Sequence, residues 1–209
     1  TMKVTTLMLG PIATNCYVVE PGDGSCIVLD ISEEIGKLTA YLEANALTVS
    51  AILLTHGHYD HIGGVARIQK AYQAPVYVHA ADAAMLTSEK ESMATWLANQ
   101  PFDPVTKFQT IQDGETISIG SLSFHVLHTP GHTSGSVCYQ CEDVLFSGDT
   151  LFRLSRGRTD FPGGSDADML QSLKRLYDLP GDYTVYPGHN EATTLQYERN
   201  HNPNMRGFR

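Results

Sequence analysis

Short apolar runs, each closed by a turn, recur along the whole sequence. Runs of this length, with alternating or β-branched residues, are typical of β-strands, and Gly, Pro, Asp and Asn residues mark the turns between them. The predicted strands cover residues 3–9, 15–20, 25–30, 49–54, 75–79, 106–111, 115–119, 122–128, 136–141, 143–147 and 183–186.

Apolar residues at helical spacing follow each batch of strands. They predict helices over residues 33–46, 66–72, 80–98, 166–178 and 191–200. In the helix at 166–178, the expected apolar stripe is Met169, Leu170, Leu173 and Leu176. Two batches of strands, each followed by helix, predict an α+β fold in which two sheets pack together with helices outside.

Composition narrows the class of protein. The chain has 209 residues, 42% hydrophobic and 18% charged, and we expect a single domain over residues 1–209. The formal net charge of −9 disfavours nucleic acid as a partner and leaves small molecules. The sequence has no run of about 18 apolar residues and no charged leader before an apolar core, so we expect a cytoplasmic protein that does not bind membranes. The oligomeric state is left open.

Four cysteines are too few for a disulfide scaffold in a chain of this size. Cys138 and Cys141 have the spacing of a redox or zinc motif, but they lie in a predicted strand, where positions i and i+3 point to opposite faces. We therefore expect buried structural thiols.

The densest chemical signal is the run THGHYDH at residues 55–61, which begins where the strand at 49–54 ends. It supplies four potential metal ligands, His56, His58, Asp60 and His61. Imidazole and carboxylate suit zinc, iron or manganese. The alternative is that Asp60 caps a helix and that the histidines are polar loop residues. The density of ligand types favours a metal.

Three further apolar runs end in a glycine-containing turn followed by one ligand-type residue: His132, Asp149 and His189. Each alone would more often be a loop residue, but the repeated pattern favours ligands. Five histidines and two aspartates exceed the needs of one ion, so we predict a dinuclear centre. One ion would bind His56, His58 and His132, the other Asp60, His61 and His189, with Asp149 bridging. His125 and His128 lack the turn and are left out.

These motifs resemble the metallo-β-lactamase superfamily, in order from about Gly10 to Pro203: THGHYDH, TPGHTSGS, FSGDTLF and YPGHNE. Within it, GDTLFRLSRGRTDFPGG and ERNHNP are similar to the glyoxalase II-like hydrolases. The resemblance implies a four-layer αββα sandwich and two divalent metal ions per chain. The implied metal is zinc, although iron and manganese occupy these sites in relatives.

The sequence also departs from parts of this family. Metallo-β-lactamases generally carry a cysteine where this chain has Asp149, which argues against antibiotic hydrolysis. Full-length glyoxalase II continues into a helical domain that holds glutathione, and it has a tyrosine where this chain has Glu191. The family's thioester chemistry is therefore expected, while recognition of glutathione is left open.

The implied reaction is hydrolysis of a hydroxyacyl thioester, such as S-lactoylglutathione, by a hydroxide shared between two metal ions. Asp60 would be catalytic, receiving a proton. Arg153, Arg156 and Arg158 crowd the loop after Asp149, and Arg158 matches a basic substrate-binding position of the family; solvated loop arginines are the alternative. A persulfide dioxygenase with a single iron and the same fold is the competing function, and a protein with purely structural metals is a third.

Overall fold

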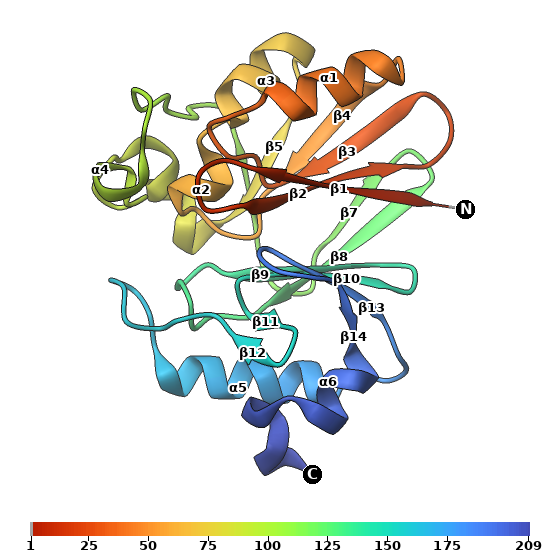
Figure 1. Cartoon of the computed structure of the whole chain (residues 1–209), viewed down its shortest axis with the longest axis vertical. Helices are drawn as coiled ribbons and strands as arrows, with labels where there is room; N and C mark the ends of the chain where they lie inside the picture. Colours follow the sequence, from red (N-terminus) through yellow and green to blue (C-terminus); the bar gives the residue numbers. More distant parts are fainter. Residues whose placement is uncertain (1) are drawn as a thin grey trace. The chain divides into compact units, whose positions relative to one another are not determined.

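The computed structural model describes residues 2–209, and its strands form two six-stranded sheets and one two-stranded ribbon (Figure 1). The chain divides into two units. The first unit comprises residues up to Ile111 with Ile119–Leu122, and the second comprises Gln112–Ser118 with Ser123–Arg209. The single domain expected over residues 1–209 remains a prediction.

The first sheet combines an antiparallel start with a parallel continuation. In spatial order its strands are β1 (Lys3–Leu9), β2 (Thr14–Glu20), β3 (Ser25–Leu29), β4 (Thr48–Leu53), β5 (Val76–His79) and β6 (Gln109–Ile111). β1, β2 and β3 pair antiparallel, and β3 to β6 pair parallel. Parallel neighbours need a crossover connection, and helices α1 (Gly36–Ala44) and α3 (Val65–Tyr72) supply two of them.

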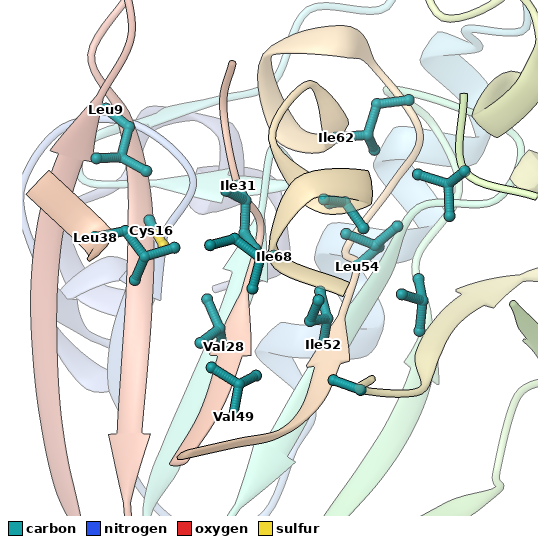
Figure 2. Packing of buried hydrophobic residues seen from close by; sticks show 14 of the residues in the cluster. Leu9, Cys16, Val28, Ile31, Leu38, Val49, Ile52, Leu54, Ile62 and Ile68 are labelled. Carbon is teal, nitrogen blue, oxygen red and sulfur yellow. The ribbon is translucent and has the colours of Figure 1, made fainter. Parts of the chain in front are cut away.

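Helices α1 and α3 cover one face of this first sheet (Figure 1). Leu38 of α1 and Ile68 of α3 are buried in one cluster with Val28 and Ile52 of the strands (Figure 2). Full burial of each such side chain contributes about 1.5–3 kcal/mol, so this cluster supplies much of the stability of the unit.

The second sheet lies in the second unit except for residues 119–122. In spatial order its strands are β14 (Thr193–Thr194), β13 (Thr184–Pro187), β10 (Val144–Gly148), β9 (Val137–Cys141), β8 (Leu122–His128) and β7 (Thr116–Ile119). Helix α5 (Asp166–Tyr177) precedes β13 in the chain, and helix α6 (Leu195–His201) and the 3-10 helix η2 (Pro203–Phe208) follow β14. One buried core joins the helices to this sheet, and it contains Met169, Leu173, Leu176 and Leu195 together with residues of the strands.

Several predicted elements have different bounds in the structure. The helix expected over residues 33–46 starts only at Gly36, so Glu33 precedes it. The helix expected over 80–98 is split into η1 (Ala80–Thr87) and α4 (Ala94–Leu97), with Met93 in the left-handed region at φ 65°. The strand expected over 106–111 is reduced to β6. The helix expected over 191–200 begins after β14, at Leu195.

Two predictions about buried side chains have different outcomes. All four cysteines are buried thiols outside disulfides, as expected, and burial raises the pKa of the Cys138 thiol to about 12. Leu170, in contrast, was placed on the apolar stripe of α5 and is 56% exposed, so that prediction is wrong. Among the described residues, no helix is both long and apolar enough to cross a membrane.

Candidate metal centre

In the first unit, four ligand-type residues follow directly from the end of β4. His56 and His58 lie in the connecting segment, and Asp60 and His61 lie on the short helix α2 (Tyr59–Ile62). All four are buried. The ring centroids of His56 and His58 are 5.0 Å apart, and those of His56 and His61 are 4.1 Å apart. The predicted ligands of this run therefore gather in one place.

A buried carboxylate fixes the orientation of His61. Asp30, 3% exposed, follows β3 with a left-handed φ of 58°. Its Oδ2 lies 2.8 Å from Nδ1 of His61 and accepts a hydrogen bond from Thr55 Oγ1, while Oδ1 accepts one from the Thr55 backbone N–H. With Nδ1 engaged by a carboxylate, the His61 tautomer carries its proton there, so Nε2 keeps a lone pair for a metal. Asp30 is not among the residues predicted from the sequence, although it too stands at a strand end.

Other contacts fix the same segment. Asp82 Oδ2 accepts a hydrogen bond from the backbone N–H of Gly57 at 3.0 Å, and a Cβ at Gly57 would lie 2.6 Å from Cβ of Met85. Thr14 Oγ1 donates to Asp60 Oδ2 at 3.1 Å. These contacts restrict movement of the ligand segment and leave no room for a side chain at Gly57.

Tyr59 attaches the ligand helix to the segment before α1. Its hydroxyl donates to Glu33 Oε2 at 3.0 Å, and the Glu33 carboxylate also accepts from the backbone N–H groups of Asn99 and Gln100. Glu33 is 2% exposed. Glu33 is the first residue of the helix predicted over residues 33–46, whereas in the structure it precedes α1 and acts as a buried acceptor.

In the second unit, His132, Asp149 and His189 arrive on three separate turns, after β8, β10 and β13. Nδ1 of His132 lies 2.7 Å from the backbone carbonyl oxygen of Arg158, which can only accept, so His132 donates from Nδ1 and its Nε2 carries the lone pair. Nε2 of His132 and Nε2 of His189 lie 3.3 Å and 3.4 Å from Oδ2 of Asp149.

Glycine is required beside Asp149. A Cβ at Gly157 would lie 1.7 Å from the backbone oxygen of Asp149 and 3.4 Å from Cβ of His132. The ribbon of β11 (Leu151–Phe152) and β12 (Ser155–Arg156) turns back here, and only a residue without a side chain permits the approach. This contact sets the position of the segment that carries Asp149.

The donor atoms within each unit have the spacing of metal ligands. His61 Nε2 and Asp60 Oδ2 are 3.2 Å apart, similar to the pairs around Asp149. A direct hydrogen bond from a protonated imidazole to a carboxylate is shorter, about 2.7–2.9 Å. Two ligands at about 2.0 Å from a tetrahedral zinc ion stand about 3.3 Å apart. The residues therefore fit a divalent cation in chemistry and in spacing.

The three arginines of the loop after Asp149 are all paired with carboxylates of the second unit. Arg153 lies 2.9 Å from Glu191, and Arg156 lies 3.1 Å from Asp166. Arg158 donates to both oxygens of Asp160, at 2.6 Å and 2.7 Å, and its guanidinium lies 4.1 Å from the Phe161 ring centroid. The Arg158 hydrogen bonds lower the pKa of Asp160 to about 2. The substrate-binding role expected of Arg158 remains a prediction.

Histidines that sequence analysis left out have other partners. His79 Nδ1 accepts the backbone N–H of Ala81, and His125 Nδ1 lies 2.9 Å from Thr116 Oγ1. His128 Nε2 lies 2.8 Å from the backbone oxygen of Ser134. Among the described residues, two groups of His and Asp side chains could hold a metal ion. They contain all seven predicted ligands and none of these three histidines.

Comparison with known sequences gives consistent matches over nearly the whole chain. A family model described as the metallo-beta-lactamase superfamily matches residues 9–189. An uncharacterized protein of Mycobacterium tuberculosis is 38% identical, covering 99% of each chain. The probable metallo-hydrolase YqgX of Bacillus subtilis is 33% identical with the same coverage. A hydroxyacylglutathione hydrolase of Shewanella baltica is 39% identical over 93% of this chain, which spans 64% of that protein.

Solved structures of similar proteins also match nearly the whole chain. The BLEG-1 B3 metallo-beta-lactamase has a TM-score of 0.92 and 37% identity, with 98% of this chain and 100% of that chain covered. TTHA1623 in a di-iron-bound form has a TM-score of 0.85 and 39% identity, covering 96% and 99%. ETHE1 from Myxococcus xanthus has a TM-score of 0.78 and 28% identity, covering 98% and 85%. The predicted fold class, with two sheets and helices, is confirmed.

Proposed function

Since the chain belongs to the metallo-β-lactamase superfamily, we propose that its two ligand sets together hold two divalent metal ions and that the protein hydrolyses a hydroxyacyl thioester. The observation that carries the proposal is the spacing of imidazole nitrogen and carboxylate oxygen, 3.2–3.4 Å, found in both units. The names of two relatives, a probable metallo-hydrolase and a hydroxyacylglutathione hydrolase, support a metallohydrolase.

The assignment of ligands follows the sequence prediction. His56, His58 and His132 would hold one ion and Asp60, His61 and His189 the other, with Asp149 as a ligand of both. The di-iron form of TTHA1623 supports two ions. We propose zinc, because borderline imidazole and carboxylate ligands suit it, with iron and manganese as the alternatives to be separated by metal analysis.

The residues then divide the chemistry. The bound cations would lower the pKa of water toward about 7 and stabilise negative charge on a carbonyl oxygen. Asp60, whose Oδ2 accepts a hydrogen bond from Thr14 Oγ1, would receive the proton that the attacking water loses. Asp30 and the carbonyl of Arg158 hold His61 and His132 in the tautomer that leaves Nε2 available. A thioester suits this site because a thiol, with a pKa of about 8.5, leaves without strong general acid catalysis.

The test combines metal analysis with turnover. The protein is purified without chelator, its metal content per chain is measured, and thiol release from S-lactoylglutathione is followed. We expect about two metal ions per chain and thiol release that a chelator abolishes. His132→Ala should lower both the metal content and the rate, whereas the matched His125→Ala should leave both unchanged. Metal-loaded protein that releases no thiol would refute the thioester proposal.

Two other activities are candidates. A persulfide dioxygenase, the competing function that the sequence resemblance implies, would consume oxygen with glutathione persulfide and release no thiol from a thioester. Asp149 argues against β-lactam hydrolysis, whereas the similarity to the B3 metallo-beta-lactamase BLEG-1 favours it; the loss of absorbance of a chromogenic cephalosporin would measure this activity. Running the three assays on one metal-loaded preparation ranks the three functions.

A further inference from the structure

A large cavity of the first unit has none of the seven predicted metal ligands in its lining. Its volume is about 950 Å³, and small-molecule sites in proteins commonly measure about 300–1,000 Å³. One wall is a face of α3, the floor is the chain at the start of β5, and the other wall is the irregular segment that leads into β6. We call this cavity the basic groove, after Arg67, Lys70 and Lys107 in its lining.

Hydrogen bonds fix the walls of the basic groove. The side-chain amide of Gln69 on α3 donates to the backbone oxygen of Ala74 at 3.1 Å and to that of Lys107 at 2.9 Å. It therefore ties the helix to the floor and to the far wall. In the far wall, the backbone N–H of Val105 donates to the backbone oxygen of Leu86 at 2.9 Å. These contacts form the groove before any ligand binds.

The charge of the basic groove is opposite to that of the chain. Three cations and one acid, Asp103, line it, whereas the chain has a formal net charge of −9. Arg67 and Asp103 also line a second cavity of about 340 Å³ that reaches Tyr59, so these two opposite charges stand where the two cavities meet. Lys70 and Lys107 line only the basic groove, and no acid offsets them there.

The two lysines are both available to a ligand. Among residues 2–209, neither of them forms an ion pair. Lys70 lies in the last turn of α3, where a cation also stabilises the helix dipole, but Lys107 lies outside any helix or strand, so this explanation does not cover it. Gln69 directly precedes Lys70 and contacts the backbone of Lys107, so the two lysines flank the same place and can bind one dianion together.

Apolar side chains line the same groove. Phe108 is half-buried and packs against the core of the first unit, and Pro75 and Val76 lie in the floor. A ring placed against these side chains would lose apolar contact with water while an attached anion stays near the lysines. The lining therefore suits a ligand that carries a ring and a dianion.

We propose that the basic groove binds a small phosphorylated molecule with an apolar ring, with the phosphate on Lys70 and Lys107 and the ring against Phe108. An ammonium group suits phosphate because it is a compact charge with three hydrogen-bond donors. This site goes beyond the proposed function and does not depend on which reaction the metal centre catalyses.

Three probes test the site when they are titrated into metal-loaded protein at mildly alkaline pH, with NMR detection at the backbone amides of Gln73, Lys107 and Gln109. Phenylphosphonate carries a ring and a dianion that cannot be hydrolysed off, methylphosphonate carries only the dianion, and phenol only the ring. We expect phenylphosphonate to bind about tenfold more tightly than either other probe. Lys70→Gln combined with Lys107→Gln should weaken both phosphonates about five- to tenfold and leave phenol unchanged.

Lys37→Gln combined with Lys90→Gln is the matched control, because it removes two exposed lysine charges of the same unit that do not line the groove. It should leave all three affinities unchanged. Phosphonates also bind metal ions, and such binding would shift the amide signals of residues 56–61 and persist in the Lys70→Gln, Lys107→Gln variant. Shifts confined to residues 56–61, no binding of phenylphosphonate, or an equal effect of the control variant would overturn the site.

Discussion

The two units present their candidate ligands in different ways. In the first unit, four ligands come from seven consecutive positions, all are buried, and buried carboxylates of Asp30, Asp82 and Glu33 hold the segment. In the second unit, three ligands come from three separate turns, and the surrounding loop carries exposed ion pairs. The His189 side chain is 20% exposed, whereas that of His61 is fully buried.

This difference separates two requirements of a metal enzyme. Holding metal ions needs donors whose direction is fixed by their neighbours, and the first unit is built for that. Choosing a substrate needs charges that a ligand can reach, and the second unit has them. Substitutions in the first unit should therefore change metal content and stability, and substitutions in the loop of the second unit should change ligand preference.

The substitution with the largest expected effect tests whether the Asp149 segment of the second unit is also held rigidly. Gly157→Ala places a Cβ against the backbone oxygen of Asp149, so the ribbon or the Asp149 segment must shift. We expect a loss of about 3 kcal/mol in the free energy of unfolding and reduced metal content. Chemical denaturation and metal analysis measure both. Gly36→Ala, where a Cβ meets nothing within 4 Å, is the control, and equal results for the two variants would contradict the steric argument.

Asp30→Asn tests the support of His61. Asparagine tolerates the left-handed φ of 58°, so the backbone is kept while the charged acceptor for His61 Nδ1 is lost. We expect about a 10- to 100-fold weaker affinity for one metal ion, measured by competition with a chelator. Two unchanged metal affinities would show that Asp30 only stabilises the fold.

Glu33→Gln tests the attachment of the ligand helix. An amide retains one acceptor oxygen, but the carboxylate serves Tyr59, Asn99 and Gln100 at once. We expect a loss of about 1–2 kcal/mol in stability. Amide hydrogen exchange should become faster in α4 and at Asn99 and stay unchanged in α5. Faster exchange in α5 to the same extent would indicate a general destabilisation instead.

The smallest expected effect lies in the exposed loop. Arg158→Gln removes the hydrogen bonds that lower the pKa of Asp160 to about 2, so this pKa should rise toward the ordinary 3.8. A lowered pKa favours folding above the ordinary value and loses that contribution as the pH falls toward 2. Because both side chains are exposed, we expect no measurable change in stability at neutral pH. NMR titration of the Asp160 carboxyl carbon measures the shift, and an unchanged pKa would show that Arg158 does not set it.

The sequence predicted well those features that local patterns determine. The strands at 3–9 and 122–128 and the helix at 166–178 match the structure within one residue, because periodic burial leaves its mark on consecutive side chains. The candidate ligands could be predicted because each run that carries them combines ligand-type residues with a strand end, and all seven lie in groups that could hold a metal ion.

The features that the sequence did not predict depend on distant partners. Asp30 and Glu33 stand 31 and 26 residues from His61 and Tyr59, so no local sequence pattern links them to these partners. The break in the helix expected over 80–98 occurs where Ser92 accepts a hydrogen bond from the backbone N–H of Tyr59. Leu170 fits the helical spacing but is exposed, because the core of the second unit covers a narrower stripe of α5.

The backbone and the side chain of Arg158 have separate roles. Its backbone oxygen holds the His132 ring, while its side chain points to Asp160 and Phe161. Every amino acid has that carbonyl, so the side chain at this position can be exchanged, and the charge of the loop changed, while the His132 imidazole keeps its proton on the same nitrogen.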